Sequence, residues 1–298
     1  MEPAFIIARF VQYAAASILF GSALLITRSQ IEFPGAKALL LGGSVSLAVA
    51  SFAGLVLQTA MLAGSFAEGV HLETLALVMD TMSFATAAAL RGLAGLAATL
   101  VLLVLPLSRQ VRIWVLACGA VGCVTFAWSG HAAATEGTAR MVHLASDAIH
   151  ALAAAGWIGA LIVFVLLAGL AARQAGSAAR LAKLLADFSP IGLTLVTLLV
   201  VSGLTNSWLL FGYDAAVVVT TTYGKLLVAK LALFAVMFAL AAVHRQHLAP
   251  ALESGARTVG ASTTGVVGKL RLSLGAEAIA GMAIFAVVSV IGTLDPFR

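Results

Sequence analysis

The sequence predicts an all-α, polytopic membrane protein, a bundle of about eight transmembrane helices. Apolar residues make up 62% of the chain and charged residues only 10%, and the mean hydropathy is +1.09. A soluble domain carries about 25% charged residues. The apolar residues occur in runs of about 20, which is the length that crosses a bilayer as a helix. The alternation of apolar and polar residues that a membrane barrel requires is missing from these runs.

The spans follow one another along the whole chain, and we expect a single integral-membrane domain over residues 1–298. The N-terminal stretch has neither the basic start nor the small-residue cleavage site of a secretory signal peptide, so it is expected to be the first span. The expected spans are residues 4–26, 36–62, 83–105, 113–131, 142–171, 184–210, 222–243 and 272–294.

Two connections between spans are longer than the others. Residues 64–82 contain acidic side chains together with leucine, valine and methionine, and this pattern predicts a short amphipathic helix on the membrane surface. Residues 244–271 contain many Gly, Ser and Thr residues in their second half, and a flexible linker is expected over residues 244–271.

The loop charges predict the orientation, because cytoplasmic loops of membrane proteins are enriched in Lys and Arg. Eleven of the 17 cations fall in the connections after spans one, three, five and seven: Arg28, Lys37, Arg109, Arg112, Arg173, Arg180, Lys183, Arg245, Arg257, Lys269 and Arg271. The opposite loops contain Arg140 and the acidic residues Glu68, Glu73, Asp80, Glu136 and Asp214. Both termini are therefore expected outside the cytoplasm. The net charge of +5 is explained by these loops, and no nucleic-acid partner is expected.

Ionisable residues gather around the connection between spans four and five. His143, Asp147 and His150 have the spacing i, i+4, i+7 and therefore share one face of a helix, and Trp157 continues the same stripe. His131 precedes the turn expected at residues 136–138 and should lie at nearly the height of His143. Ionisable groups inside a membrane span are candidate functional residues by default.

Imidazole and carboxylate are ligands for Zn, Cu, Fe or Ni, and the spacing does not choose among these metals. His150 should lie roughly 10 Å deeper than His143, at about 1.5 Å per residue. The pattern therefore predicts a ladder from the outer surface into the bilayer, with room for one ion or for successive stations. A satisfied polar packing seam is the alternative interpretation.

Other polar residues are expected near this ladder or at the opposite end of the bundle. Lys230 lies at a depth that suits an ion pair with Asp147, and Asn206 is placed to line the same outer cavity. Glu277 is expected near the inner face, with His244 or Arg271 as its partner.

These residues resemble the bacterial copper resistance protein D family (CopD). The resemblance is carried by a Gly-His-Ala at residues 130–132, by the His-x-x-x-Asp-x-x-His of residues 143–150 and by a Trp-x-Gly at residues 157–159. Further marks follow from about residue 91 onward: Tyr223-Gly224-Lys225-Leu226-Leu227, Lys230, Arg245, Pro250, Leu270-Arg271, Glu277 and Leu294-Asp295-Pro296.

The resemblance implies a multi-pass protein of the bacterial inner membrane that serves copper homeostasis or resistance. It implies a copper ion as cargo, received from the periplasm and moved across the membrane, and a small CopC-like periplasmic copper carrier as a partner. By motif position it implies His131, His143, Asp147 and His150 as the copper ligands, with Trp157 as packing behind them.

Two other functions stay open from the sequence. A b-type haem protein would need two imidazoles facing each other across the bundle, and His150 is expected to face Thr125 of span four. A membrane anchor that docks a periplasmic copper carrier would not depend on the histidines for metal. The chain contains no phosphate-binding P-loop and no nucleophile paired with a base, so neither an ATP-driven pump nor an enzyme is predicted.

Overall fold

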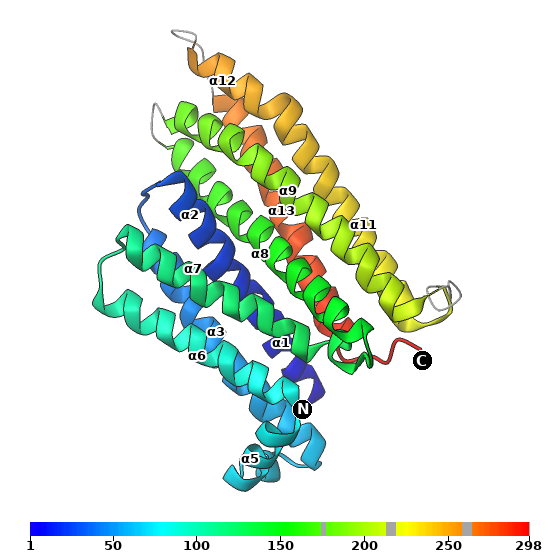
Figure 1. Ribbon diagram of the computed structural model, residues 1–298. Helices are drawn as coiled ribbons and strands as arrows, with labels where there is room; N and C mark the ends of the chain where they lie inside the picture. Colours follow the sequence, from blue (N-terminus) through cyan, green and yellow to red (C-terminus); the bar gives the residue numbers. More distant parts are fainter. Residues whose placement is uncertain (174–176, 213–218, 258–263, 298) are drawn as a thin grey trace.

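The structure, a computed structural model, describes residues 1–173, 177–212, 219–257 and 264–297, and within these ranges every regular element is a helix (Figure 1). Eight of its helical segments are long and apolar enough to cross a membrane, as the sequence predicts. The α-helices are α1 (Glu2–Ser17), α2 (Ala23–Ser29), α3 (Ala36–Ala63), α4 (Phe66–Gly69), α5 (Leu72–Thr81), α6 (Ser83–Val104), α7 (Arg109–Val124), α8 (Ala139–Ala171), α9 (Ser177–Phe211), α11 (Thr222–Val243), α12 (Ala249–Arg257) and α13 (Thr264–Ile291). Short π-helical segments are Ile18–Ser22 and His244–Leu248, and short 3-10 segments are Thr125–Ser129 and His131–Ala134.

The helices form two groups that meet along the first span and α8. On one side α3 packs between α1 and α6, and α6 packs against α7. On the other side α8 packs against α9, and α13 packs against α8 and α11 (Figure 1). Because α8 contacts α1, α7, α9 and α13, side chains along it face several neighbours at once.

The first span and α8 approach each other so closely that only glycine fits between them. A Cβ atom added at Gly159 would lie 2.1 Å from the carbonyl oxygen of Ser17, and one added at Gly21 would lie 2.1 Å from that of Ala155. The Ser22 hydroxyl donates a hydrogen bond to the Gly159 carbonyl at 3.0 Å. Small residues at helix crossings allow such backbone contact inside a membrane. This contact fixes α8 against the N-terminal group.

The termini, α5 and the α7–α8 connection lie at one end of the bundle, and α12 lies at the other (Figure 1). The connections from α2 to α3 and from α6 to α7 lie at the end of α12; Arg28 is in the last turn of α2, and Arg109 is the first residue of α7. Asp214, counted among the residues of the opposite end, lies outside the described residues.

The two long connections differ in outcome. The short helix predicted within residues 64–82 is confirmed as α5, which buries Val78 and exposes Leu72 and Leu77; its position on a membrane surface stays a prediction. The flexible linker predicted over residues 244–271 is wrong for residues 244–257, because α11 continues through a π-helical turn into α12, and for residues 264–271, which form the start of α13. Pro250 is the second residue of α12, which directly follows the π-helical turn His244–Leu248. Residues 258–263 of the predicted linker lie outside the described residues.

Candidate metal-binding cavity

The chain reverses between α7 and α8 where the sequence predicts, at Gly137, whose φ of 70° suits glycine. The preceding span ends earlier than expected, since the α-helix stops at Val124 and a 3-10 segment continues to Ser129. His131 therefore lies beyond the end of the span, in the separate 3-10 turn His131–Ala134. This turn folds back towards the start of α8.

A cavity of about 220 Å³ opens beneath this turn, between the first span, α8, α9, α11 and α13. Six of the seven residues predicted for the site line it: His131, His143, Asp147, His150, Asn206 and Lys230. We call it the outer cavity.

His131 brings an imidazole without a complete set of protein partners. Its Nε2 atom is buried and has no hydrogen-bond partner in the part of the chain that the structure describes. Its ring packs edge-on against Tyr223, with the ring centroids 5.3 Å apart. Burial, and after it the positive charge of Arg9, lowers the pKa of His131 below its ordinary value. The ring is therefore neutral near pH 7, which is the form that binds metals.

His143 and His150 each use Nδ1 for a hydrogen bond to a hydroxyl group. His143 Nδ1 lies 2.7 Å from Thr135 Oγ1, and His150 Nδ1 lies 3.0 Å from Ser202 Oγ of α9. Metal-binding histidines typically engage their second nitrogen in this way, which fixes the ring and its tautomer.

The tautomer of His150 follows from the bonding of Ser202. The single hydroxyl proton of Ser202 is donated to the backbone carbonyl of Leu198, one turn earlier on α9. Ser202 Oγ therefore accepts the bond from His150, and the proton of the neutral imidazole resides on Nδ1. Nε2 then carries the lone pair of the ring, and His150 lines the outer cavity.

Asp147 is bound by an amide rather than by a cation. Asn206 Nδ2 donates to Asp147 Oδ1 at 3.2 Å, while the Asn206 Oδ1 atom is buried without a hydrogen-bond partner in the described residues. The predicted ion pair between Lys230 and Asp147 is wrong at contact distance, since the ion pairs within 4.0 Å among the described residues do not include it. Lys230 lines the same cavity, so the two charges face each other across it.

The ligands do not form a closed metal cage. Among the described residues, no three His, Cys, Asp or Glu side chains form a group that could hold an ion. The expected contact between His150 and Thr125 is also wrong, because His150 contacts α9 whereas Thr125 accepts a hydrogen bond from Arg91. The residues surround one cavity from several helices, and they do not converge on a single point.

Arg9 is a residue of the cavity that the sequence analysis misses. Only 7% of its surface is exposed, and its guanidinium donates to the Tyr13 hydroxyl at 2.8 Å and to the Ser129 carbonyl at 3.5 Å. A Cβ atom at Gly292 would lie 2.0 Å from Arg9 Nη2, so α13 ends against this side chain only because residue 292 is glycine. The sequence feature that could have indicated Arg9 is a single arginine within the apolar part of the first span.

The chain is similar to known proteins over most of its length. The model of the copper resistance protein D-like N-terminal domain matches residues 1–141, and the copper resistance protein D model matches residues 182–291. Copper resistance protein D of Pseudomonas syringae pv. tomato is 29% identical over 307 residues, which cover 99% of this chain and 97% of that protein. The chain belongs to the copper resistance protein D family. Inner membrane protein YebZ of Escherichia coli strain K12 is 28% identical over 178 residues, covering 58% of this chain and 56% of that protein. No solved structure matches.

With its eight apolar helices, this member of the copper resistance protein D family is a multi-pass protein of the inner membrane. The two matched segments flank residues 142–181. His131 belongs to the first segment, and Asn206 and Lys230 belong to the second. His143, Asp147 and His150 lie between the two, on α8, and the fold brings them to residues of both segments.

Trp157 lies away from the outer cavity, contrary to the packing role expected for it. It is seven residues beyond His150, or roughly 10 Å along the helix axis, and lines a second cavity of about 490 Å³. Its Nε1 atom donates to Glu277 Oε1 at 2.9 Å. The predicted partnership of Glu277 with His244 is confirmed, with His244 Nδ1 3.1 Å from Glu277 Oε2. We call the cavity that Trp157, His244 and Glu277 line the inner cavity.

Arg91 is not among the residues that line the outer cavity, but it binds side chains of the segment that precedes His131. Its side chain is 2% exposed and donates to Gln12 Oε1 at 2.8 Å, to Thr125 Oγ1 at 3.1 Å and to Ser129 Oγ at 3.1 Å. The guanidinium also lies over the Phe126 ring, 3.9 Å from its centroid. These bonds hold the 3-10 segment that leads to His131. The partners of this buried cation are thus two hydroxyl groups and one amide oxygen.

Proposed function

We propose that this protein binds copper as cargo in the outer cavity and passes it into the membrane. One observation supports this most directly: His150 lines the cavity, and Ser202 holds its ring through Nδ1, so that Nε2 carries the lone pair of the neutral imidazole. His131 adds a buried Nε2 without a protein partner, and Asp147 adds a carboxylate. Imidazole and carboxylate together are ligands for copper.

The side of the membrane from which copper enters is proposed from the distribution of Lys and Arg among the connections. The cation-rich connections lie at the end of the bundle opposite the outer cavity, and Lys- and Arg-rich loops stay in the cytoplasm. Both termini and the outer cavity would then face the periplasm. A small CopC-like periplasmic carrier is the donor that this orientation suits.

The proposed route begins at His131 and His143, passes Asp147 and reaches His150. Beyond His150 the residues between the outer and inner cavities are closely packed. Trp157 contacts Phe234 edge-on with ring centroids 5.8 Å apart, and a Cβ atom at Gly281 would lie only 2.8 Å from the Ile158 side chain. Complete transport would therefore require these side chains to move, and binding in the outer cavity is the first step of the proposal.

A b-type haem fits the outer cavity poorly. A volume of about 220 Å³ is below the roughly 300–1,000 Å³ of sites for drug-sized ligands, and the porphyrin ring is of that size class. The partner of His150 across the helices is Ser202, where a haem with two axial imidazoles would place a histidine.

Copper binding to the purified full-length protein in detergent tests the proposal. We expect His143→Ala and His150→Ala each to lower copper affinity at least tenfold in a competition titration. His247→Ala is the matched control, because His247 is exposed and lies at the other end of the bundle. An unchanged copper content in the double variant of His143 and His150 would contradict the proposal and favour a membrane anchor. A Soret band in the absorbance spectrum would favour haem.

A further inference from the structure

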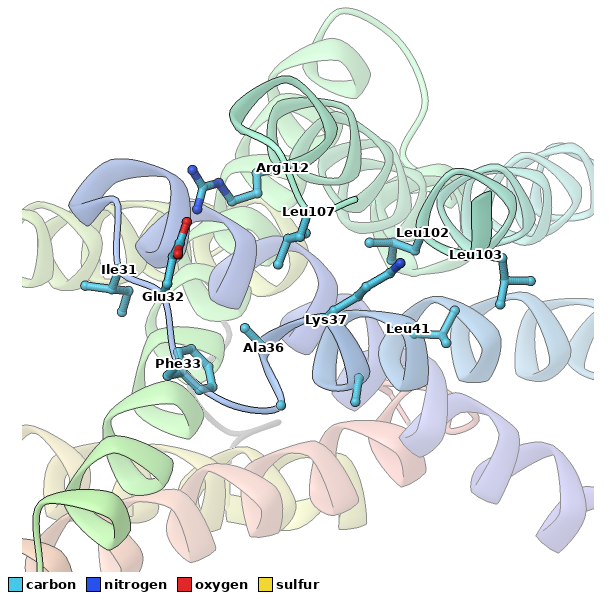
Figure 2. A pocket seen from close by; sticks show the side chains of 12 residues that line it. Ile31, Glu32, Phe33, Ala36, Lys37, Leu41, Leu102, Leu103, Leu107 and Arg112 are labelled. Atoms are coloured by element: carbon cyan, nitrogen blue, oxygen red, sulfur yellow. The ribbon is translucent and has the colours of Figure 1, made fainter. Parts of the chain in front are cut away.

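A third cavity, of about 710 Å³, lies at the cation-rich end of the bundle. It is bounded by the segment between α2 and α3, the end of α6 and the start of α7 (Figure 2). Two cations and one acid line it: Arg112, Lys37 and Glu32. It shares no residue with the outer or the inner cavity.

Among the described residues, Arg112 has no hydrogen bond or ion pair of its side chain that accounts for its burial. The residue is only 7% exposed, and its Nε atom is buried without a hydrogen-bond partner in the part of the chain that the structure describes. The ion pairs and side-chain hydrogen bonds of the described residues do not include this guanidinium. Removing a guanidinium from water is costly unless a counter-charge compensates for it. The arrangement therefore indicates an anionic group from outside the chain.

The other charged residues of the cavity set the charge of that group. Lys37 Nζ donates one hydrogen bond, to the Leu105 carbonyl at 3.0 Å, and retains two further protons for other acceptors. Glu32 is exposed and turns its carboxylate towards Arg112, whereas Lys37 points along Leu102 (Figure 2). Two cations and one carboxylate leave a net charge of +1, which a single phosphodiester would neutralise.

The cavity walls identify the rest of the ligand. Leu102 and Leu107 line the cavity, and Leu103, which is 60% exposed, continues the apolar wall along α6 towards the bilayer. Arg112 is in the first turn of α7, at the start of an apolar segment long enough to cross a membrane. A phosphate near Arg and Lys, with apolar chain along leucines, is the chemistry of a phospholipid.

We propose that this cavity binds the phosphodiester headgroup of an anionic phospholipid from the inner leaflet, with its acyl chains along α6. The guanidinium of Arg112 and the ammonium of Lys37 contact the phosphate oxygens. The inference does not depend on copper binding; only the choice of leaflet depends on the orientation taken from the loop charges.

Native mass spectrometry of the full-length protein in detergent tests this site, with phosphatidylglycerol and phosphatidylcholine as probes. We expect phosphatidylglycerol to bind at least tenfold more tightly than phosphatidylcholine, and Arg112→Gln to abolish that preference. Arg109→Gln is the matched control, because it removes an exposed arginine from the same helix end. Glu32→Gln should tighten phosphatidylglycerol binding, since it removes a negative charge that faces the phosphate.

Folding of the variant is checked by thermal unfolding in lipid-free detergent. Arg112→Gln should melt at or above the wild-type temperature there, because an uncompensated buried charge is lost, and phosphatidylglycerol should raise the melting temperature of the wild type alone. Equal binding of the two lipids, or equal effects of Arg112→Gln and Arg109→Gln, would overturn the proposal. So would weaker binding in Glu32→Gln, or displacement of the lipid by inorganic phosphate, which would assign the site to free phosphate.

Discussion

Replacing Gly159 by alanine tests whether the close contact between α8 and the first span positions the candidate site. The added Cβ atom would lie 2.1 Å from the Ser17 carbonyl oxygen and 2.6 Å from the Cα atom of Gly21. Ordinary contacts of a Cβ atom begin near 3.4 Å. Relief of the first clash therefore requires a displacement of about 1.3 Å, the difference between 3.4 and 2.1 Å. Both clashing groups are backbone, so no side-chain rotation can provide this space.

The expected cost follows from these distances. Overpacking a tightly packed interior costs about 1–3 kcal/mol, and the upper part of this range applies when backbone has to move. The substitution also loses the hydrogen bond that Ser22 donates to the Gly159 carbonyl, if the two segments separate. Alanine regains up to about 1 kcal/mol through its higher helix propensity. A net loss of roughly 2 kcal/mol in the free energy of unfolding is expected for Gly159→Ala.

Gly169→Ala on the same helix is the matched control, because a Cβ atom at Gly169 meets nothing within 4 Å. Thermal unfolding in detergent should place Gly159→Ala several degrees below the wild type and Gly169→Ala at or above it. Copper affinity should fall in Gly159→Ala alone, since α8 carries His143 and His150. Equal melting temperatures for the two variants would refute the claim that this contact fixes α8.

The remaining predictions concern charges and hydrogen bonds around the outer cavity. Lys230→Met should tighten copper binding roughly tenfold in a competition titration. The reason is that a like charge within about 10 Å of the copper ion costs roughly 1.5 kcal/mol at an effective dielectric constant near 20. Lys225→Met, which removes an exposed lysine, is the control. Ser202→Ala should weaken copper binding about tenfold by releasing the imidazole that it orients, and Ser202→Thr should restore it. Arg91→Met should lower the free energy of unfolding by about 3 kcal/mol, because two buried partners and the half-buried Ser129 lose their donor. The exposed Arg109→Met should leave the free energy of unfolding unchanged in chemical denaturation.

The number and rough position of the spans were predictable because the bilayer imposes one requirement on every span. A helix has to stay apolar over about 20 residues, and that requirement is visible in composition alone. The ends of the helices were less predictable. Residues 244–257 stay helical because the chain absorbs Pro250 after a π-helical turn, a local solution that Gly, Ser and Thr content does not report.

The candidate site was predictable where it depends on one helix, and unpredictable where it depends on a neighbour. The spacing of His143, Asp147 and His150 follows from the period of the α-helix, and the three line one cavity. Trp157 continues their stripe in projection but lies too far along the axis to share that cavity. Arg9 enters from the first span, and no local pattern in its own helix indicates which helix it will face.

The partner of His150 depends on the rotation of α8 about its axis, which the sequence of one helix does not reveal. A helix such as α8 that touches α1, α7, α9 and α13 presents each residue to a neighbour chosen by the rotation of the whole helix about its axis. The glycine contact with the first span allows backbone approach only in one rotation of α8, and in that rotation His150 faces Ser202 and not Thr125. In the same rotation the imidazole is held through Nδ1, and His150 lines the cavity. The chemistry of the proposed copper ligand thus depends on a packing contact made by residues that carry no chemistry of their own, and a substitution there should change metal binding without touching a ligand.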